Sequence, residues 1–238
     1  MFGRRLINTQ QGGGCTTDTL QILGDTSCVA TYRLNGDATD LSGNYNGTAT
    51  SVTYVTGKFG DAADFSVSNS YIDIPSNVSP SVDVESFNYS FWISIAAAFT
   101  GAQTIVGETT DTGPVRIIVR NVSGNDYQFE FLRRYGGTYY PFDATDSFAL
   151  TPDVFYHFSL NYNPSPKSFD FYLNGSFFQS ISNISGTGPQ TAIANVGLGR
   201  YNSAIPDIDF DGKIDQVRIF DRAITAEEVT TLYNEVAC

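Results

Sequence analysis

The chain has 238 residues and a formal net charge of −12, and 41% of its residues are hydrophobic, 14% aromatic and only 16% charged. This composition predicts one folded domain with a large apolar core and excludes an intrinsically disordered chain. The 13 Lys and Arg residues are spread thinly, so we expect no nucleic-acid partner. No apolar run reaches the ~20 residues that span a bilayer, so we expect no membrane insertion.

Residues 1–27 are predicted to form an N-terminal arm that docks on another protein or on a second copy of the chain. Three consecutive glycines at 12–14 provide a flexible hinge. The predicted docking residues are Phe2, Arg4, Arg5, Leu6 and Ile7. The alternative is a frayed terminus, as most chain ends are. The polar residues 8–11 stand where a secretory signal peptide would have its apolar region, so we expect no signal peptide.

The body of the chain, from residue 28, shows short β-type runs separated by turn signals, which is typical of a β-sandwich or barrel. Asn174-Gly175 is the strongest hairpin signal, because this pair favours a type I′ turn. Strands are predicted near 29–35, 51–56, 61–66, 71–75, 87–95, 103–108, 114–121, 126–134, 138–142, 155–163, 168–174, 176–182, 192–199 and 213–220.

The C-terminal stretch, residues 210–236, reads as a turn, a strand and a closing helix. Thr225 and Glu228 have the spacing of a capping box, in which each side chain binds a free backbone N–H of the first helical turn. An apolar stripe at helical spacing follows, formed by Val229, Leu232, Tyr233 and Val236. We therefore expect this helix to lie on a sheet.

Four ordered segments resemble laminin-G-like, concanavalin-A-like lectin and glucanase domains over roughly residues 28–237. They are a first strand with an acidic D-x-S-G-N turn (32–44), a second landmark (57–60 continuing to 71–75), a central hairpin (155–158 and 171–175) and the C-terminal stretch (210–236). The resemblance implies an all-β, antiparallel two-sheet jelly-roll sandwich with a short C-terminal helix, occupying residues 28–238. Fold alone does not fix function, because it hosts lectins, glycanases and structural modules.

The same resemblance implies a structural Ca²⁺ between the first acidic turn and the last strand. Asp40 and Asp215 occupy the matching positions, and Asn46 is a possible further ligand. Oxygen ligands from loops suit Ca²⁺. The alternative is that Asp40 caps its own turn and Asp215 accepts hydrogen bonds from nearby amides.

Catalytic patterns are missing from the sequence. The E-x-D-x-x-E string of jelly-roll glucanases does not occur, nor does a Gly-x-Ser-x-Gly elbow or a zinc-ligand spacing. His157 is the only histidine, and we interpret it as a core residue or a cross-strand hydrogen-bonding residue. Asp207, Asp209 and Asp211 precede Gly212 as in an EF-hand loop, but Arg218 stands at the twelfth position, where that loop needs a bidentate Glu. We therefore expect a protein that is not an enzyme.

Sugar binding is the positive option, since it needs aromatic faces beside groups that bind hydroxyls. The candidate residues are Arg134, Tyr135, Tyr139 and Tyr140 on a predicted hairpin, and Arg200, Tyr201 and Asn202 on a loop. The alternatives are ordinary tyrosines at a sheet edge, or tyrosines buried against a neighbouring subunit.

The three cysteines, Cys15, Cys28 and Cys238, leave at least one thiol unpaired in a monomer. Cys28 could pair with Cys15 or with Cys238, or all three could be free thiols.

Together these features favour a non-enzymatic virion structural protein, of the capsid-decoration or tail-fibre type of a phage, that displays a lectin-like domain. Its expected partners are other virion proteins or copies of itself, and a cell-surface glycan. It would be assembled in the host cytoplasm and exposed outside after lysis. The alternative function is a free, calcium-dependent carbohydrate-binding module, and a glycan hydrolase is the least favoured.

Overall fold

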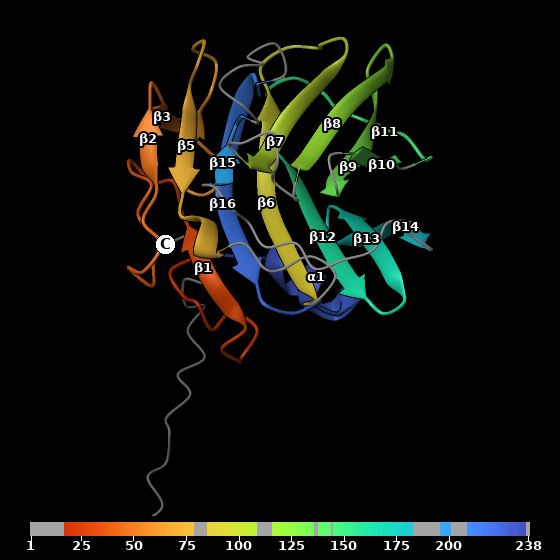
Figure 1. Ribbon diagram of the computed structural model, residues 1–238. Coiled ribbons are helices and arrows are strands. Elements are labelled where there is room, and N and C mark those ends of the chain that lie inside the picture. Colours follow the sequence, from red (N-terminus) through yellow and green to blue (C-terminus); the bar gives the residue numbers. More distant parts are fainter. Residues whose placement is uncertain are drawn as a thin grey trace, which may run out of the picture.

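A computed structural model describes residues 17–78, 85–108, 116–135, 138–143, 145–182, 196–200 and 209–236. Two antiparallel sheets pack face to face, with one short helix on the outer side (Figure 1). The predicted all-β jelly-roll sandwich is therefore confirmed. Within these ranges no helix is long and apolar enough to cross a membrane.

The first sheet contains the last strand of the chain near its centre. Its order is β14 (Ser176–Ser182), β13 (Lys167–Leu173), β12 (Tyr156–Pro164), β6 (Phe87–Ile95), β16 (Gly212–Phe220), β4 (Asp61–Asp64) and β3 (Thr53–Thr56), and β1 (Cys28–Tyr32) also pairs with β16. The predicted Asn174-Gly175 hairpin joins β13 to β14, and both residues have positive φ, at 50° and 78°, as a type I′ turn requires.

The second sheet faces the first across the core. Its order is β10 (Thr138–Asp143), β9 (Asp126–Tyr135), β8 (Arg116–Ser123), β7 (Ala102–Glu108), β15 (Val196–Leu198), β5 (Tyr71–Ile74) and β2 (Thr48–Thr50), and β11 (Phe148–Ala149) pairs with β9. A 3₁₀ turn, η1 (Ser76–Val78), follows β5. The strand predicted over 51–56 is present as β3, which begins two residues later, whereas β2 has no counterpart among the predicted strands. Ser51, at φ 53°, lies between β2 and β3, which belong to different sheets.

Alternation along β6 shows how the sequence builds the core. The residues of one parity, Phe87, Tyr89, Phe91, Ile93 and Ile95, point into the apolar core between the sheets. Residues of the other parity, Asn88, Ser90, Trp92 and Ser94, lie on the opposite face of the same sheet and are also buried. Both faces of β6 are therefore covered, which requires a second layer outside the sandwich.

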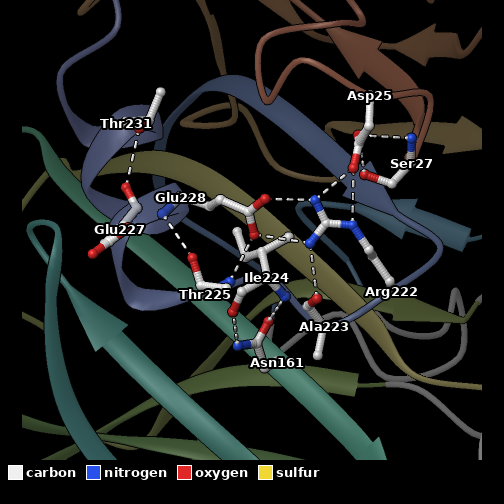
Figure 2. Close-up of polar contacts among 10 residues, drawn as sticks. All are labelled: Asp25, Ser27, Asn161, Arg222, Ala223, Ile224, Thr225, Glu227, Glu228 and Thr231. Atoms are coloured by element: carbon white, nitrogen blue, oxygen red, sulfur yellow. Dashed lines mark hydrogen bonds and ion pairs between the residues drawn. The ribbon is translucent and has the colours of Figure 1, made fainter.

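Helix α1 (Ala226–Tyr233) provides part of that outer layer. The predicted capping box is confirmed, since Thr225 Oγ1 accepts from the Glu228 N–H and Glu228 accepts from the Thr225 N–H. Asn161 on β12 holds the residue before the cap in both directions, binding the N–H and the C=O of Ile224 at 2.9 and 2.7 Å (Figure 2). The helix is therefore fixed at its start by side chains from the sheet beneath it.

The predicted apolar stripe of this helix is only partly buried. Val229 and Leu232 join a small apolar cluster with Phe220 and Ile224. The helix ends at Tyr233, so Val236 falls outside it and is 49% exposed.

Residues 17–27 pack against the outer face of the first sheet. Their apolar members Leu20, Ile22 and Leu23 contact the same small cluster. Arg222 joins this segment to the helix by binding Asp25 and Glu228 together (Figure 2). Residues 1–16 lie outside the described residues, so docking through Phe2, Arg4, Arg5, Leu6 and Ile7 stays a prediction.

Strand β16 carries a bulge where it meets these outer elements. Gln216 has φ 49°, and the register with β6 shifts between Asp215 and Arg218. Gln216 Nε2 then binds the Thr17 carbonyl at 3.1 Å and Glu235 at 2.8 Å. Arg218 follows, and its fully buried guanidinium binds Glu235 at 3.0 Å and the Thr19 carbonyl at 2.6 Å. The bulge thus connects both ends of the described chain to one strand.

Cys28 is a buried free thiol, at the start of β1. Its Sγ lies 3.4 Å from the Ala30 carbonyl and 3.3 Å from Thr31 Oγ1. Cys15 and Cys238 lie outside the described residues.

Candidate functional site

A polar hollow lies where two loops meet at the start of β16. Residues 65–70, between β4 and β5, and residues 209–211, before β16, line a pocket of about 220 Å³, which we call the loop pocket. Backbone hydrogen bonds hold the two loops in place. Phe65 N–H donates to the Gly212 carbonyl and Phe210 N–H donates to the Gly199 carbonyl, each with an N–O distance of 2.8 Å. The pocket is therefore formed by residues that are far apart in the sequence.

The lining of the loop pocket combines hydroxyl, amide and carboxylate groups with two phenyl rings. Serine and asparagine side chains come from the 65–70 loop, and Asp209 and Asp211 come from the other side. Phe65 and Phe210 are buried beneath them, with ring centroids 6.3 Å apart. Such a mixture suits a small ligand that has both hydroxyl groups and apolar C–H faces.

Ser70 is the most informative group in this lining. Its side chain is only 2% exposed, and its Oγ has no hydrogen-bond partner. A buried hydroxyl without a partner is costly, so native structures seldom contain one without a reason. Ser70 therefore brings to the lining of the loop pocket a buried hydroxyl that the described residues leave without a partner.

Negative charge is concentrated at the same place. Burial, and then the nearby Asp64 carboxylate, raise the pKa of Asp211 above its usual range. The described lining contains no basic residue.

Arg200, a predicted sugar-binding residue, directly follows Gly199, whose carbonyl accepts from Phe210 N–H, and its own side chain is held by neighbouring side chains. Its Nη2 binds both carboxylate oxygens of Asp73, at 2.8 and 3.0 Å, and its guanidinium lies 3.2 Å from the ring centre of Tyr71. Tyr71 directly follows Ser70 in the chain. The charge of Arg200 is thus balanced by Asp73, and its role here is to hold β5 against the end of β15.

The other predicted sugar-binding residues cannot be placed with the loop pocket. Tyr201 and Asn202 lie outside the described residues. Strands β9 and β10 do form the predicted hairpin, with Tyr139 opposite Arg134. The side chains of Arg134, Tyr135, Tyr139 and Tyr140 lie outside the described part of the structure, so their role stays a prediction.

The predicted calcium ligands Asp40 and Asn46 take part in the hydrogen bonds of a turn. Asp40 Oδ1 accepts from the Thr31 N–H at 2.9 Å, and Oδ2 accepts from the Ser42 hydroxyl. Asn46 Oδ1 accepts from the Asp40 N–H at 3.1 Å. This arrangement is the turn-capping alternative that the sequence left open.

Asp215 accepts hydrogen bonds from a different loop. Its Oδ2 binds the Lys58 and Phe59 N–H groups at 2.8 and 2.9 Å, while its Oδ1 is buried without a partner. Burial raises the pKa of Asp215 to about 7, against these amide bonds. Asp215 therefore keeps one oxygen that accepts no hydrogen bond, whereas both oxygens of Asp40 accept one. Among the described residues no three His, Cys, Asp or Glu side chains gather as a metal site, and calcium stays a prediction.

His157 has the structural role that the sequence predicts. It is 1% exposed, its Nε2 lies 2.8 Å from the Ser90 hydroxyl, and it packs beside Trp92. Burial lowers the pKa of His157 to about 3. Trp92 in turn stacks on Tyr233 of α1, with ring centroids 5.5 Å apart. This group of rings explains how the helix is attached to the sheet.

The fold and the loop pocket define a lectin-type jelly roll with a small polar hollow at one end. The chain belongs to the concanavalin A-like lectin/glucanase superfamily, whose family model matches residues 66–230. No curated protein matches the chain.

Solved structures with the same fold include both carbohydrate-associated and toxin domains. Domain 4 of AbnA, a GH43 extracellular arabinanase from Geobacillus stearothermophilus, was solved with arabinotriose; it is 23% identical, with a TM-score of 0.69 over 87% of this chain and 98% of that one. The binding domain of Paraclostridial Mosquitocidal Protein 1 is 19% identical, with a TM-score of 0.67 over 86% of this chain and 51% of that one. The ligand-binding domain of botulinum neurotoxin serotype D, solved with N-acetylneuraminic acid, is 17% identical, with a TM-score of 0.64 over 87% and 50%. The chain thus spans about half the length of these toxin domains.

The sequence did not identify the loop pocket. The sequence predicts no role for Ser66, Ser68, Asn69 and Ser70, and it presents Asp209 and Asp211 only as part of an incomplete EF-hand pattern. A usable signal was the occurrence of small polar residues next to a buried Phe in both stretches, Phe65-Ser66 and Phe210-Asp211.

Proposed function

We propose that this protein is a non-enzymatic carbohydrate-binding module that recognises its ligand at the loop pocket. The observation that carries the proposal is the composition of that pocket, in which hydroxyl, amide and carboxylate groups surround buried phenyl rings. These are the groups that bind sugar hydroxyls and pack against sugar C–H faces. The family membership and the arabinotriose complex of the AbnA domain support the same assignment.

The experiment is a glycan array with the full chain, followed by calorimetry on any glycan that binds. We expect binding to fall when Asp211 is replaced by Asn or Ser70 by Ala. Lys213→Gln is a control, because Lys213 follows the pocket loop in sequence but points to Asp153 and not to the pocket. If no glycan on the array binds, the proposal is refuted.

A glycan hydrolase is the second candidate, because Asp209 and Asp211 line the same pocket and burial raises the pKa of Asp211. A general acid with a raised pKa beside a second carboxylate is the arrangement that glycoside hydrolysis uses. Incubation of each bound glycan with the protein, followed by chromatography, separates the two candidates. Turnover that is lost in both Asp209→Asn and Asp211→Asn would make the protein an enzyme.

We further propose that the module is displayed on a phage particle, on the capsid or the tail, and is anchored there by residues 1–16. The layout supports this proposal. The loop pocket lies at the start of β16, whereas residues 17–27 and β1 lie along the second half of that strand. In Figure 1, β5 begins at the upper end of the sandwich, whereas β1 lies at the lower end. An anchored N-terminus would therefore leave the pocket facing away from the particle.

A truncation tests the anchoring. Removal of residues 1–16 should abolish incorporation into particles and leave the melting temperature and glycan binding unchanged, because the cut precedes the Thr17 and Thr19 carbonyls that bind Gln216 and Arg218. Normal incorporation of this truncated protein would contradict the proposal.

A further inference from the structure

We propose that the loop pocket holds one neutral sugar ring and rejects acidic sugars. This inference rests on the proposed function and adds the class of ligand. It is drawn from the charge of the pocket, from its size and from the unpartnered hydroxyl of Ser70.

The charge of the pocket discriminates against anions. Asp209 and Asp211 line it, Asp64 is close enough to perturb Asp211, and the described lining contributes no positive charge. Arg200 stands nearby, but Asp73 neutralises it. A sugar carboxylate placed here would meet like charges in a partly dehydrated site, and like-charge contacts are a standard means of rejecting a wrong ligand.

The carboxylates also stabilise a bound neutral sugar directly, by accepting hydrogen bonds from its hydroxyls. Ionised Asp oxygens accept hydrogen bonds and do not donate them, and sugar hydroxyls can donate. Hydrogen bonds to charged groups are stronger than those between neutral groups. Asp209 and Asp211 can therefore bind two hydroxyls of a ring, while Ser70 Oγ can donate to or accept from a third.

The size of the pocket indicates one ring. About 220 Å³ is many times the space of a single water. It is also below the ~300–1,000 Å³ of sites that bury drug-sized ligands. Phe65 and Phe210 belong to the core directly behind this lining, so that side of the pocket offers a metal ion no further oxygen ligand from a side chain. These points favour a sugar over a cation.

The test compares two kinds of ligand on the full chain. The probes are the methyl glycosides of arabinose, glucose, galactose and mannose on one side, and the methyl glycoside of N-acetylneuraminic acid on the other, at physiological ionic strength. We expect at least one neutral glycoside to bind, and N-acetylneuraminic acid to bind at least about tenfold more weakly. Asp211→Asn should weaken neutral binding by no more than a few-fold, because the amide oxygen still accepts a hydrogen bond, and should strengthen binding of the acidic sugar.

Ser70→Ala tests the location, and Ser94→Ala is its matched control. Both serines are buried with an unpartnered Oγ, but Ser94 lies on β6 and does not line the pocket. Neither change should lower the melting temperature, because each removes a hydroxyl that has no partner. We expect Ser70→Ala to weaken the neutral sugar about 3- to 10-fold and Ser94→Ala to leave it unchanged.

The outcomes are distinguishable. Equal binding of neutral and acidic sugars overturns the charge selection but leaves the proposed function standing. If no sugar binds, on this panel or on the array, both the proposed function and the inference of a neutral ligand are refuted. Sugar binding that Ser70→Ala does not change overturns the location. Calcium binding measured without sugar, and lost in Asp211→Asn, would make the pocket a cation site and overturn the inference.

Discussion

The buried pair of Arg218 and Glu235 gives the sharpest prediction about stability. The guanidinium is fully buried and the carboxylate is 2% exposed, and they make two contacts, Nε–Oε1 at 3.0 Å and Nη2–Oε2 at 3.1 Å. Replacing Glu235 by Gln keeps the size of the side chain and removes only its charge. The positive charge of Arg218 then stays buried, because an arginine does not lose its proton in proteins.

Removing one partner of a buried ion pair costs about 3–5 kcal/mol, because the other charge remains desolvated. In a protein of this size each kcal/mol lowers the melting temperature by about 2–4 °C. We therefore expect Glu235→Gln to lower it by about 6–20 °C. The exposed pair of Lys213 and Asp153 is the control: Asp153 is 72% exposed, so Asp153→Asn should cost less than ~1 kcal/mol.

The opposite variant, Arg218→Met, should behave differently with pH. Burial already raises the pKa of Glu235, and loss of Arg218 raises it further. A carboxyl whose pKa is higher in the folded state binds more protons there, so stability falls as the pH rises above its unfolded value of ~4.3. The cost of Arg218→Met should therefore shrink from pH 7 to pH 5, while that of Glu235→Gln should not.

Urea unfolding at both pH values, monitored by the single tryptophan, measures these costs. The double variant Arg218→Met, Glu235→Leu should lose less stability than Glu235→Gln, because no charge is left buried. A cost below ~1 kcal/mol for Glu235→Gln, or a pH-independent cost for Arg218→Met, would refute the reasoning.

Three further predictions concern other buried groups. His157, the only histidine, has a pKa of about 3, so its ring resonances in NMR should not titrate between pH 8 and pH 5; its contribution to stability should be lost as the pH falls from ~6.5, the unfolded pKa, towards about 3. Gly199→Ala should cost about 2 kcal/mol or more by thermal unfolding, because Gly199 has φ 80° and a Cβ there would overlap the Phe65 ring; a neutral effect would contradict this geometry. If Ca²⁺ binds through Asp40 and Asp215, EGTA should lower the melting temperature, and Asp215→Asn should abolish that effect; an unchanged melting temperature would exclude the ion.

Local features of the fold could be read from the sequence because neighbouring residues determine them. The Asn174-Gly175 turn and the Thr225–Glu228 cap each depend on two residues a few positions apart, and both formed as predicted. The sequence alone places residues 17–27 in the arm, because nothing local shows that Arg218 binds the Thr19 carbonyl almost 200 residues away.

The loop pocket escaped prediction for the same reason. Its lining combines residues 65–70 with 209–211, and only the sheet order brings them together. Ser70 gives no signal in the sequence, since its burial depends on the tertiary fold. The sequence suggests aromatic residues as sugar ligands because of their chemical type. It does not show which residues the fold brings together to line a pocket.

The central position of β16 has a consequence for folding during synthesis on the ribosome. This strand is the last of the described chain, yet it pairs with β6, β4 and β1 and carries the buried contacts of residues 17–27. Until it emerges, the nascent chain exposes an unpaired edge of the apolar strand β6, and such edges invite aggregation. The sandwich can therefore be completed only after β16 has been synthesised. A ribosome stall or a stop codon before residue 212 would leave an incomplete sandwich with exposed apolar surface, which chaperones would bind and proteases would degrade.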